Sequence, residues 1–131
     1  MRAAESPLAA WLGIETIAES SHEVTLRMPT RAEMGDRART VHASFVALLA
    51  DSAMGRALAE ANPDAQYQRG FDLKLNFIAP RRIGEALRAV ARVLHSGRRT
   101  GVAECRVEGE DGRLIATATA SFIVYLVESH S

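Results

Sequence analysis

The sequence predicts an α+β protein in which a curved antiparallel sheet wraps around one long central helix. An apolar stretch over residues 43–55 is rich in helix-forming residues and too long for a typical buried strand. The segments after it alternate apolar and polar residues and are joined by short turns, which favours an antiparallel meander. Such a sheet has one apolar face to cover, and the central helix is the only large apolar element that can cover it.

The chain before the central helix is predicted to form a short helix and then a strand. Proline in the first turn and a following glycine indicate a helix over residues 7–12. Residues 14–28 are predicted to be one extended segment, which Ser20-Ser21 either bulges or breaks. Residues 30–41 are polar and irregular and predict a loop that leads into the central helix.

Four strands are predicted after the central helix, which runs to about Ala61 and is stopped by Asn62-Pro63-Asp64. They cover residues 71–77, 87–93, 102–107 and 114 to about 126. Asp111-Gly112 is a strong signal for a tight hairpin between the last two strands. Many inward-facing residues are alanine, so helix and strands are expected to approach closely. We interpret residues 1–131 as a single domain, with a core from about residue 10 to residue 126.

Composition argues against a nucleic-acid or membrane partner. Sixteen basic residues balance sixteen acidic ones, so the net charge favours neither nucleic acid nor an anionic membrane surface. The single cysteine excludes an internal disulfide and a cysteine-based zinc cluster, which fits a reducing compartment. No apolar stretch has the length of a membrane span, and none near the N-terminus resembles a signal peptide. We therefore expect a cytoplasmic protein.

Asp51 is the only ionisable residue in the apolar stretch. No face of the predicted helix is free of apolar residues, so the helix is expected to be buried. A buried carboxylate is costly unless it is paired, hydrated or used. From the residues alone, two interpretations stay open: Asp51 is catalytic, or it pairs with an arginine across an interface.

The residues around Asp51 resemble a motif of the hotdog-fold thioesterases, in particular the 4-hydroxybenzoyl-CoA and phenylacetate-degradation type. That pattern is His-Gly-Gly, four variable residues and Leu-Ala-Asp. Here it reads His42-Ala43-Ser44, residues 45–48 and Leu49-Ala50-Asp51. The segment over residues 76–84 is similar to the family's strand that ends in proline, with glycine four residues on. The resemblance covers roughly residues 10–125.

The resemblance implies an acyl-CoA thioesterase that works as a dimer or a dimer of dimers, without a metal or redox cofactor. It implies that Asp51 acts as general base on water or attacks the carbonyl directly. The backbone amide of Ala43 would polarise the thioester carbonyl. Burial is expected to raise the pKa of Asp51. With the motif included, we favour catalysis over pairing with an arginine.

The sequence departs from the family pattern at two places. Ala43 and Ser44 replace both glycines, and Ala43 keeps its amide, so its role requires backbone angles that suit a non-glycine residue. Asp36 stands six residues before His42, where some relatives carry asparagine, and a carboxylate cannot donate a hydrogen bond to a carbonyl. A non-catalytic acyl-CoA-binding or regulatory hotdog protein is therefore the alternative. A hotdog hydratase is a third reading, for which no suitable pair of histidine and acid is present.

Further residues near the motif are candidates for substrate binding. Ser44 shares a helical face with Asp51 and either contacts the substrate or caps the helix. His42 orients the loop or the substrate, or is purely structural, and metal binding is not favoured without partner ligands. Arginine suits phosphate recognition. The candidates for the phosphates of coenzyme A lie at predicted strand ends, where each is alternatively a solvated surface charge: Arg81, Arg82, Arg98 and Arg99.

The spacing of Ala43 and Asp51 has a geometric consequence. Eight residues span about 12 Å along a helix at 1.5 Å per residue, so both groups of one helix cannot contact the same carbonyl. A second copy running antiparallel would bring Asp51 of one chain near Ala43 of the other and create two equivalent sites. This agrees with the resemblance, since the sites of that family lie at a dimer interface.

Overall fold

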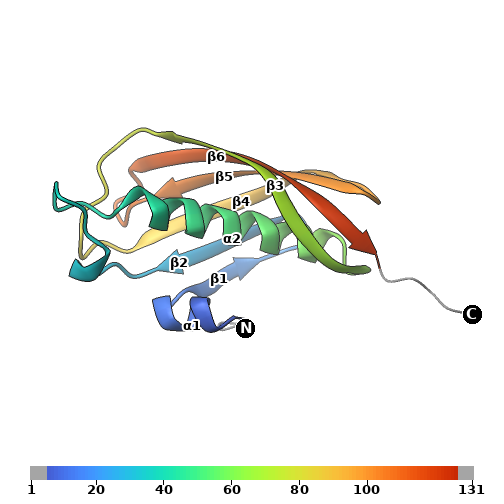
Figure 1. The fold of residues 1–131 in the computed structure, drawn as a ribbon, viewed down its shortest axis with the longest axis horizontal. Coiled ribbons are helices and arrows are strands. Elements are labelled where there is room, and N and C mark those ends of the chain that lie inside the picture. The colour runs from blue at the N-terminus through green and yellow to red at the C-terminus, as the bar shows by residue number, and fades with distance from the viewer. Residues whose placement is uncertain (1–5, 127–131) are drawn as a thin grey trace, which may run out of the picture.

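The computed structural model describes residues 6–126, apart from the side chains of residues 66 and 67. Over this range the helical segments are α1 (Pro7–Leu12), the 3₁₀ segment η1 (Ala32–Met34) and α2 (Ala43–Ala61). The strands are β1 (Glu15–Glu19), β2 (Glu23–Met28), β3 (Ala65–Phe77), β4 (Leu87–Ser96), β5 (Thr100–Glu108) and β6 (Leu114–Leu126). The predicted α+β class is confirmed (Figure 1).

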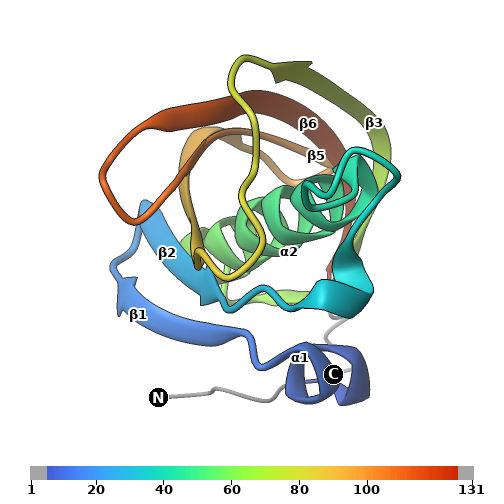
Figure 2. The same ribbon diagram turned by 90° about the vertical axis from the view of Figure 1, so that its left-hand side faces the viewer.

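All six strands belong to one sheet, in the order β1-β2-β4-β5-β6-β3. Every neighbouring pair is antiparallel. Figure 2 shows the sheet curling around α2 from β1 to β3, which are the two edge strands. The curved sheet around one long helix, predicted from the sequence, is therefore confirmed.

The core lies between α2 and the concave face of the sheet. The helix packs mainly on β4 and β5, and small side chains dominate this contact. Fully buried alanines come from the helix and from both strands: Ala50, Ala53, Ala57, Ala89, Ala91 and Ala103. Because interiors are close-packed, methyl-sized side chains let the helix lie near the sheet. The expected close approach is thus borne out.

The segment before the central helix forms a hairpin of β1 and β2 and not a single strand. The Ser20 N–H donates to the Glu23 carbonyl at 2.8 Å, and Ser20 Oγ accepts from the Glu23 N–H at 3.2 Å. These bonds close a tight turn that ends the first strand. Of the two readings of Ser20-Ser21, the break is correct, and two strands precede α2 instead of the one predicted.

Strand β3 begins at Ala65 and not at residue 71. Its register with β6 shifts between Gly70 and Asp72. Phe71 lies at this bulge, and 59% of its surface is exposed. A bulge leaves a residue unpaired and bends the strand. A Cβ atom at Gly70 would lie 3.7 Å from Oδ1 of Asp51, so the bulge lies beside that carboxylate.

The expectation that α2 is buried on every side is wrong for a single chain. Its sheet-facing residues are buried, but Ser44, Asp51 and Ala59 are exposed on the flank that the strands leave uncovered. Ala47 and Leu48 on this flank are only partly buried. Small and apolar residues make up most of the flank, so composition did not identify it as surface.

The alanine contact predicts how α2 responds to a larger side chain. Replacing the buried Ala53 with leucine should lower the free energy of unfolding by about 1–3 kcal/mol, because the close contact between helix and sheet leaves no room for it. Replacing the exposed Ala59 with leucine on the same helix should change it by less than about 0.5 kcal/mol. Denaturant unfolding of both variants measures the difference; equal stabilities would contradict the described packing.

Candidate active site

Asp51 lies near the middle of α2, where two hollows meet. The first, here called the β3 hollow, has a volume of about 530 Å³ and lies between α2 and β3. Its lining comes from these two elements: Ser44, Ala47, Leu48, Asp51, Gly70, Phe71, Asp72 and Leu73. Ser44, Ala47, Leu48 and Asp51 follow the i, i+3, i+4, i+7 spacing of one helical face. The predicted shared face of Ser44 and Asp51 is therefore confirmed.

The second hollow, here called the α1 hollow, has a volume of about 840 Å³ and lies on the other side of Asp51. Segments far apart in the sequence enclose it, including α1, β2, α2, β3 and β6. Its apolar lining comes mainly from Ala9, Ile14, Leu26, Ala59 and Phe122, and Arg56 and Gln68 are among the polar residues. A carboxylate at the junction of two hollows is accessible to a ligand in either one.

The environment of Asp51 raises its pKa above the ordinary value, because the surrounding protein displaces part of its hydration. The side chain is nevertheless exposed in a single chain. It makes no hydrogen bond or ion pair with residues 6–126, so desolvation acts on the pKa without an opposing partner. Within residues 6–126 no arginine pairs with Asp51; the pairing considered from the sequence was with an arginine across an interface.

Ala43 is the first residue of α2, and its backbone N–H is an unused donor. The first N–H groups of a helix have no acceptor within the helix, and they lie at the positive end of its dipole. In the range 6–126 no residue accepts a hydrogen bond from the Ala43 N–H. The amide is therefore free to donate to a substrate oxygen, as the predicted role requires.

His42, and not Ser44, caps this helix. His42 Nδ1 accepts from the Ser44 N–H at 3.1 Å and lies 2.8 Å from Ser44 Oγ. The capping role considered for Ser44 is wrong, because Ser44 is already inside the first turn, where its own N–H needs an acceptor. The His42 N–H donates to the Met34 carbonyl at 2.8 Å, which ties the cap to η1.

Asp36 is engaged in its own loop and does not reach the site. Its carboxylate accepts from the Thr40 N–H and the Ala38 N–H, each at 3.0 Å, and from the Thr40 hydroxyl. The hydrogen bond from the Thr40 backbone is the largest cause of the lowered pKa of Asp36, which the nearby Arg81 also lowers. These contacts give Asp36 a structural role and no free atom that could donate to a carbonyl.

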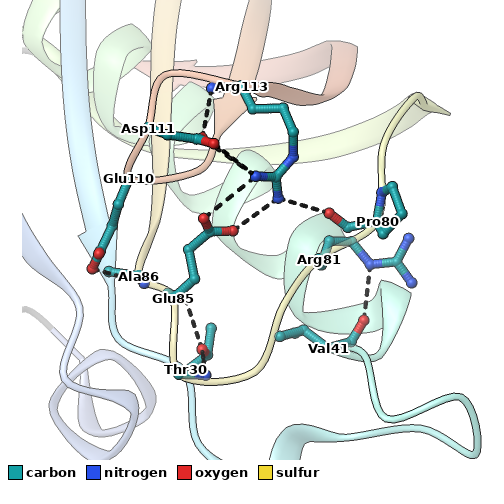
Figure 3. Close-up of polar contacts among 10 residues, drawn as sticks. Thr30, Val41, Pro80, Arg81, Glu85, Ala86, Glu110, Asp111 and Arg113 are labelled. Atoms are coloured by element: carbon teal, nitrogen blue, oxygen red, sulfur yellow. Dashed lines mark hydrogen bonds and ion pairs between the residues drawn. The ribbon is translucent and has the colours of Figure 1, made fainter.

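The four candidate arginines are not brought together in one chain. Arg81 Nε donates to the Val41 carbonyl at 2.8 Å (Figure 3), and the Arg81 guanidinium lies 3.9 Å from Asp36. Arg82 is next to Arg81, and its backbone forms an isolated β-bridge with Thr40. Arg98 and Arg99 lie at the other end of α2, in the turn before β5. The helix has 19 residues, so about 28 Å separate its ends.

A polar cluster missed by the sequence analysis supports the loop that carries Arg81. Arg113 donates to Glu85 at 2.9 Å, to Asp111 at 3.1 Å and to the Pro80 carbonyl at 2.9 Å (Figure 3). The Thr30 hydroxyl donates to the Glu85 carbonyl at 2.7 Å. No local pattern in the sequence marks this cluster, because its contacts to Glu85, Pro80 and Thr30 join segments about 30 to 55 positions apart.

Within residues 6–126, no three or more His, Cys, Asp or Glu side chains are grouped in a way that would hold a metal ion. No helix in this range is long and apolar enough to cross a membrane.

The sequence model of the thioesterase superfamily matches residues 38–116, more than half of the chain and including the whole of α2. The chain therefore belongs to the thioesterase superfamily. Its sheet wrapped around one helix is the hotdog fold expected from the motif. No curated protein matches the sequence significantly.

Solved structures show the same fold. The PaaI protein of E. coli, from the phenylacetic acid degradation operon, is 21% identical, with a TM-score of 0.83 over 95% of this chain and 87% of that one. Thioesterase HI1161 from Haemophilus influenzae is 21% identical, with a TM-score of 0.86 over 96% and 87%. The conserved protein PA5202 of Pseudomonas aeruginosa is 28% identical, with a TM-score of 0.82 over 91% and 94%.

The opposite pKa shifts of Asp51 and Asp36 predict opposite effects on stability. Because the folded state raises the pKa of Asp51, it binds the proton more tightly than the unfolded state, and ionised Asp51 lowers stability as the pH rises. Asp51→Asn should therefore be more stable than the wild type at pH 7, and this gain should shrink in acid.

For Asp36 the folded pKa is lowered, so Asp36→Asn should be less stable than the wild type at pH 7, with a loss that disappears in acid. Denaturant unfolding of the three proteins between pH 3 and pH 7 measures both trends. An Asp51→Asn variant that is less stable at pH 7 would show that the carboxylate is paired.

Proposed function

We propose that this protein hydrolyses acyl-CoA thioesters. The observation that carries the proposal is that α2 presents two unused groups: the unpaired carboxylate of Asp51 and the free N–H of Ala43. Thioester hydrolysis needs a base or nucleophile and a donor for the oxyanion. The chain belongs to the thioesterase superfamily, which supports thioester hydrolysis as the reaction of these two groups.

In the general-base route, Asp51 takes a proton from water, and the water oxygen bonds to the thioester carbon. The carbonyl oxygen becomes an oxyanion that accepts a hydrogen bond from the Ala43 N–H. The carbon–sulfur bond then breaks. The sulfur of coenzyme A takes up the proton that Asp51 received from water, so coenzyme A leaves as a thiol and the free acid remains. In the nucleophilic route, the Asp51 carboxylate attacks the thioester carbon, the carbon–sulfur bond breaks, and coenzyme A leaves as a thiolate that takes up a proton from water. Water then cleaves the resulting anhydride, which releases the free acid and regenerates the Asp51 carboxylate. Both routes use the same two groups.

The site is proposed to need two chains. Ala43 and Asp51 lie on one continuous helix, about 12 Å apart along its axis. Strand β3 has one free edge beside the β3 hollow, and free edges readily pair with another strand. Phe71, Leu73 and Phe77 of β3 are exposed apolar side chains that a second copy would cover. A two-fold pair along β3 would place two copies of α2 near each other.

The α1 hollow is the proposed place of the acyl group, because it is mainly apolar and opens at Asp51. The phosphates of coenzyme A remain assigned to the candidate arginines. Arg82, Arg98 and Arg99 make no ion pair with other residues in the range 6–126, whereas Arg81 is held by Val41 and Asp36. The first three therefore fit this role better.

Asp51→Asn tests the catalytic assignment. It keeps the size of the side chain and removes the base, so kcat should fall by at least about 10²-fold while affinity for acyl-CoA is kept. The matched control is Glu104→Gln on the outer face of the sheet, where Glu104 only pairs with Arg92; its activity should be unchanged. Hydrolysis of aromatic, short-chain and long-chain acyl-CoAs is measured first, to find the best substrate.

Wild-type turnover by the Asp51→Asn variant would overturn the assignment. If the wild-type protein binds acyl-CoAs but hydrolyses none of those tested, the second candidate is favoured, a non-catalytic acyl-CoA-binding or regulatory protein. The observation that favours this second candidate is that Ala43 and Ser44 replace both glycines of the family motif.

Mixing two inactive variants tests the shared site. Ala43→Pro removes the amide donor, and proline is tolerated at the first position of a helix. The preceding His42, with φ −58° and ψ 140°, already has the extended conformation that a following proline requires. Mixed with Asp51→Asn chains, it should restore roughly a quarter of wild-type sites, since half the dimers are mixed and each has one intact site.

Mass spectrometry of tagged chains shows whether subunits have exchanged. Mixed dimers that are present and remain inactive would contradict the two-chain site.

A further inference from the structure

We propose that His42 is a positioning residue, which in its neutral form orients the Ala43 amide toward the substrate. This inference rests on the proposed function, in which that amide binds the oxyanion. The geometry points to His42 because its ring closes on the backbone on the far side of Ala43. The Nδ1 atom accepts from the Ser44 N–H at 3.1 Å, and this contact spans the peptide bond between His42 and Ala43.

The direction of the Ala43 N–H depends on rotation about the Cα–C bond of His42. That rotation is the ψ angle of His42, which is 140°. Three hydrogen bonds hold His42 in place: its N–H donates to the Met34 carbonyl at 2.8 Å, its carbonyl accepts from the Phe45 N–H at 3.0 Å, and its ring accepts from Ser44. Of these three hydrogen bonds, only the one between the ring and Ser44 can be removed by substituting the His42 side chain.

The ring contact requires a particular protonation state. An N–H donor such as that of Ser44 needs a ring nitrogen with a lone pair, so Nδ1 is unprotonated and the neutral ring carries its proton on Nε2. A second proton converts Nδ1 into a donor and ends the contact with the Ser44 N–H. It also places a positive charge at the positive end of the helix dipole. The neutral ring with its proton on Nε2 is therefore the form that caps the helix.

The surroundings of His42 contain charges of both signs, but among the described residues the ring has no hydrogen-bond partner other than Ser44. The charged groups on the segments next to it are Glu33, Asp36, Arg37, Arg39, Arg81 and Arg82. Asp36 is neutralised in part by Arg81, at 3.9 Å. On α2 itself, the first ionisable residue after His42 is Asp51, nine positions on. Among the described residues, the ring therefore has one hydrogen-bonding role, that of the cap.

Three variants separate positioning from general stability. His42→Ala removes the cap, and kcat should fall about 10- to 100-fold, less than the 10²–10³-fold of an oxyanion donor lost outright, with KM changed far less. His42→Asn supplies an acceptor that caps helices well and should return kcat to within about threefold of the wild type. His22→Ala makes the same chemical change in the β1–β2 turn and should leave kcat unchanged.

Rescue by His42→Asn gives a signature that a merely structural role would not give, because asparagine restores the acceptor for the Ser44 N–H without the imidazole ring. A His42→Asn variant that is no more active than a folded His42→Ala would overturn the inference.

One measurement on the wild-type protein is independent of turnover. Nitrogen NMR of the imidazole rings identifies the tautomer, and the neutral His42 ring should carry its proton on Nε2. A neutral His42 ring that carries its proton on Nδ1 would overturn the inference even if the enzyme is active. Absence of hydrolysis with the predicted tautomer would instead overturn the proposed function and leave His42 as the cap.

Discussion

The close packing of α2 against the curved sheet fixes the two groups proposed to react, and the rest of the proposed mechanism depends on it. Fully buried alanines between Ala50 and Ala57 pack the helix against β4 and β5, and α2 is one continuous helix. Asp51 and the Ala43 N–H are therefore fixed about 12 Å apart. Rigidity of this kind preorganises each group, but it also prevents both from serving one carbonyl in a single chain. The proposed second copy is a consequence of this spacing.

The first turn of α2 is supported from a distance. Arg113 joins the β5–β6 hairpin to Glu85 and the Pro80 carbonyl, and Arg81 one residue later holds the Val41 carbonyl at 2.8 Å (Figure 3). Val41 precedes His42, whose ring caps the helix. The segment before the proposed oxyanion donor is thus fixed on one side by the sheet and on the other by its own cap, which suits a group whose direction matters more than its charge.

The sequence was sufficient for the fold and for the central motif because both are expressed in local patterns. The bounds of α2, the hairpin at Asp111-Gly112 and the face shared by Ser44 and Asp51 all follow from spacing along the chain. The cap was misassigned because serine is the commoner capping residue, and the backbone angles that favour His42 are not visible in sequence. The exposed flank of α2 and the separation of Arg81 from Arg98 depend on how the sheet curves, which no local pattern encodes.

The central claim is that one thioester is bound between groups of two chains. A crystal structure of the Asp51→Asn variant with an intact acyl-CoA substrate tests it most directly, because the substitution removes the base and preserves the shape. The account predicts a thioester oxygen about 2.7–3.1 Å from the Ala43 nitrogen of one chain, with the substituted side chain at position 51 of the other chain beside the carbonyl carbon. A carbonyl that contacts position 51 and an oxyanion donor of the same chain would contradict it.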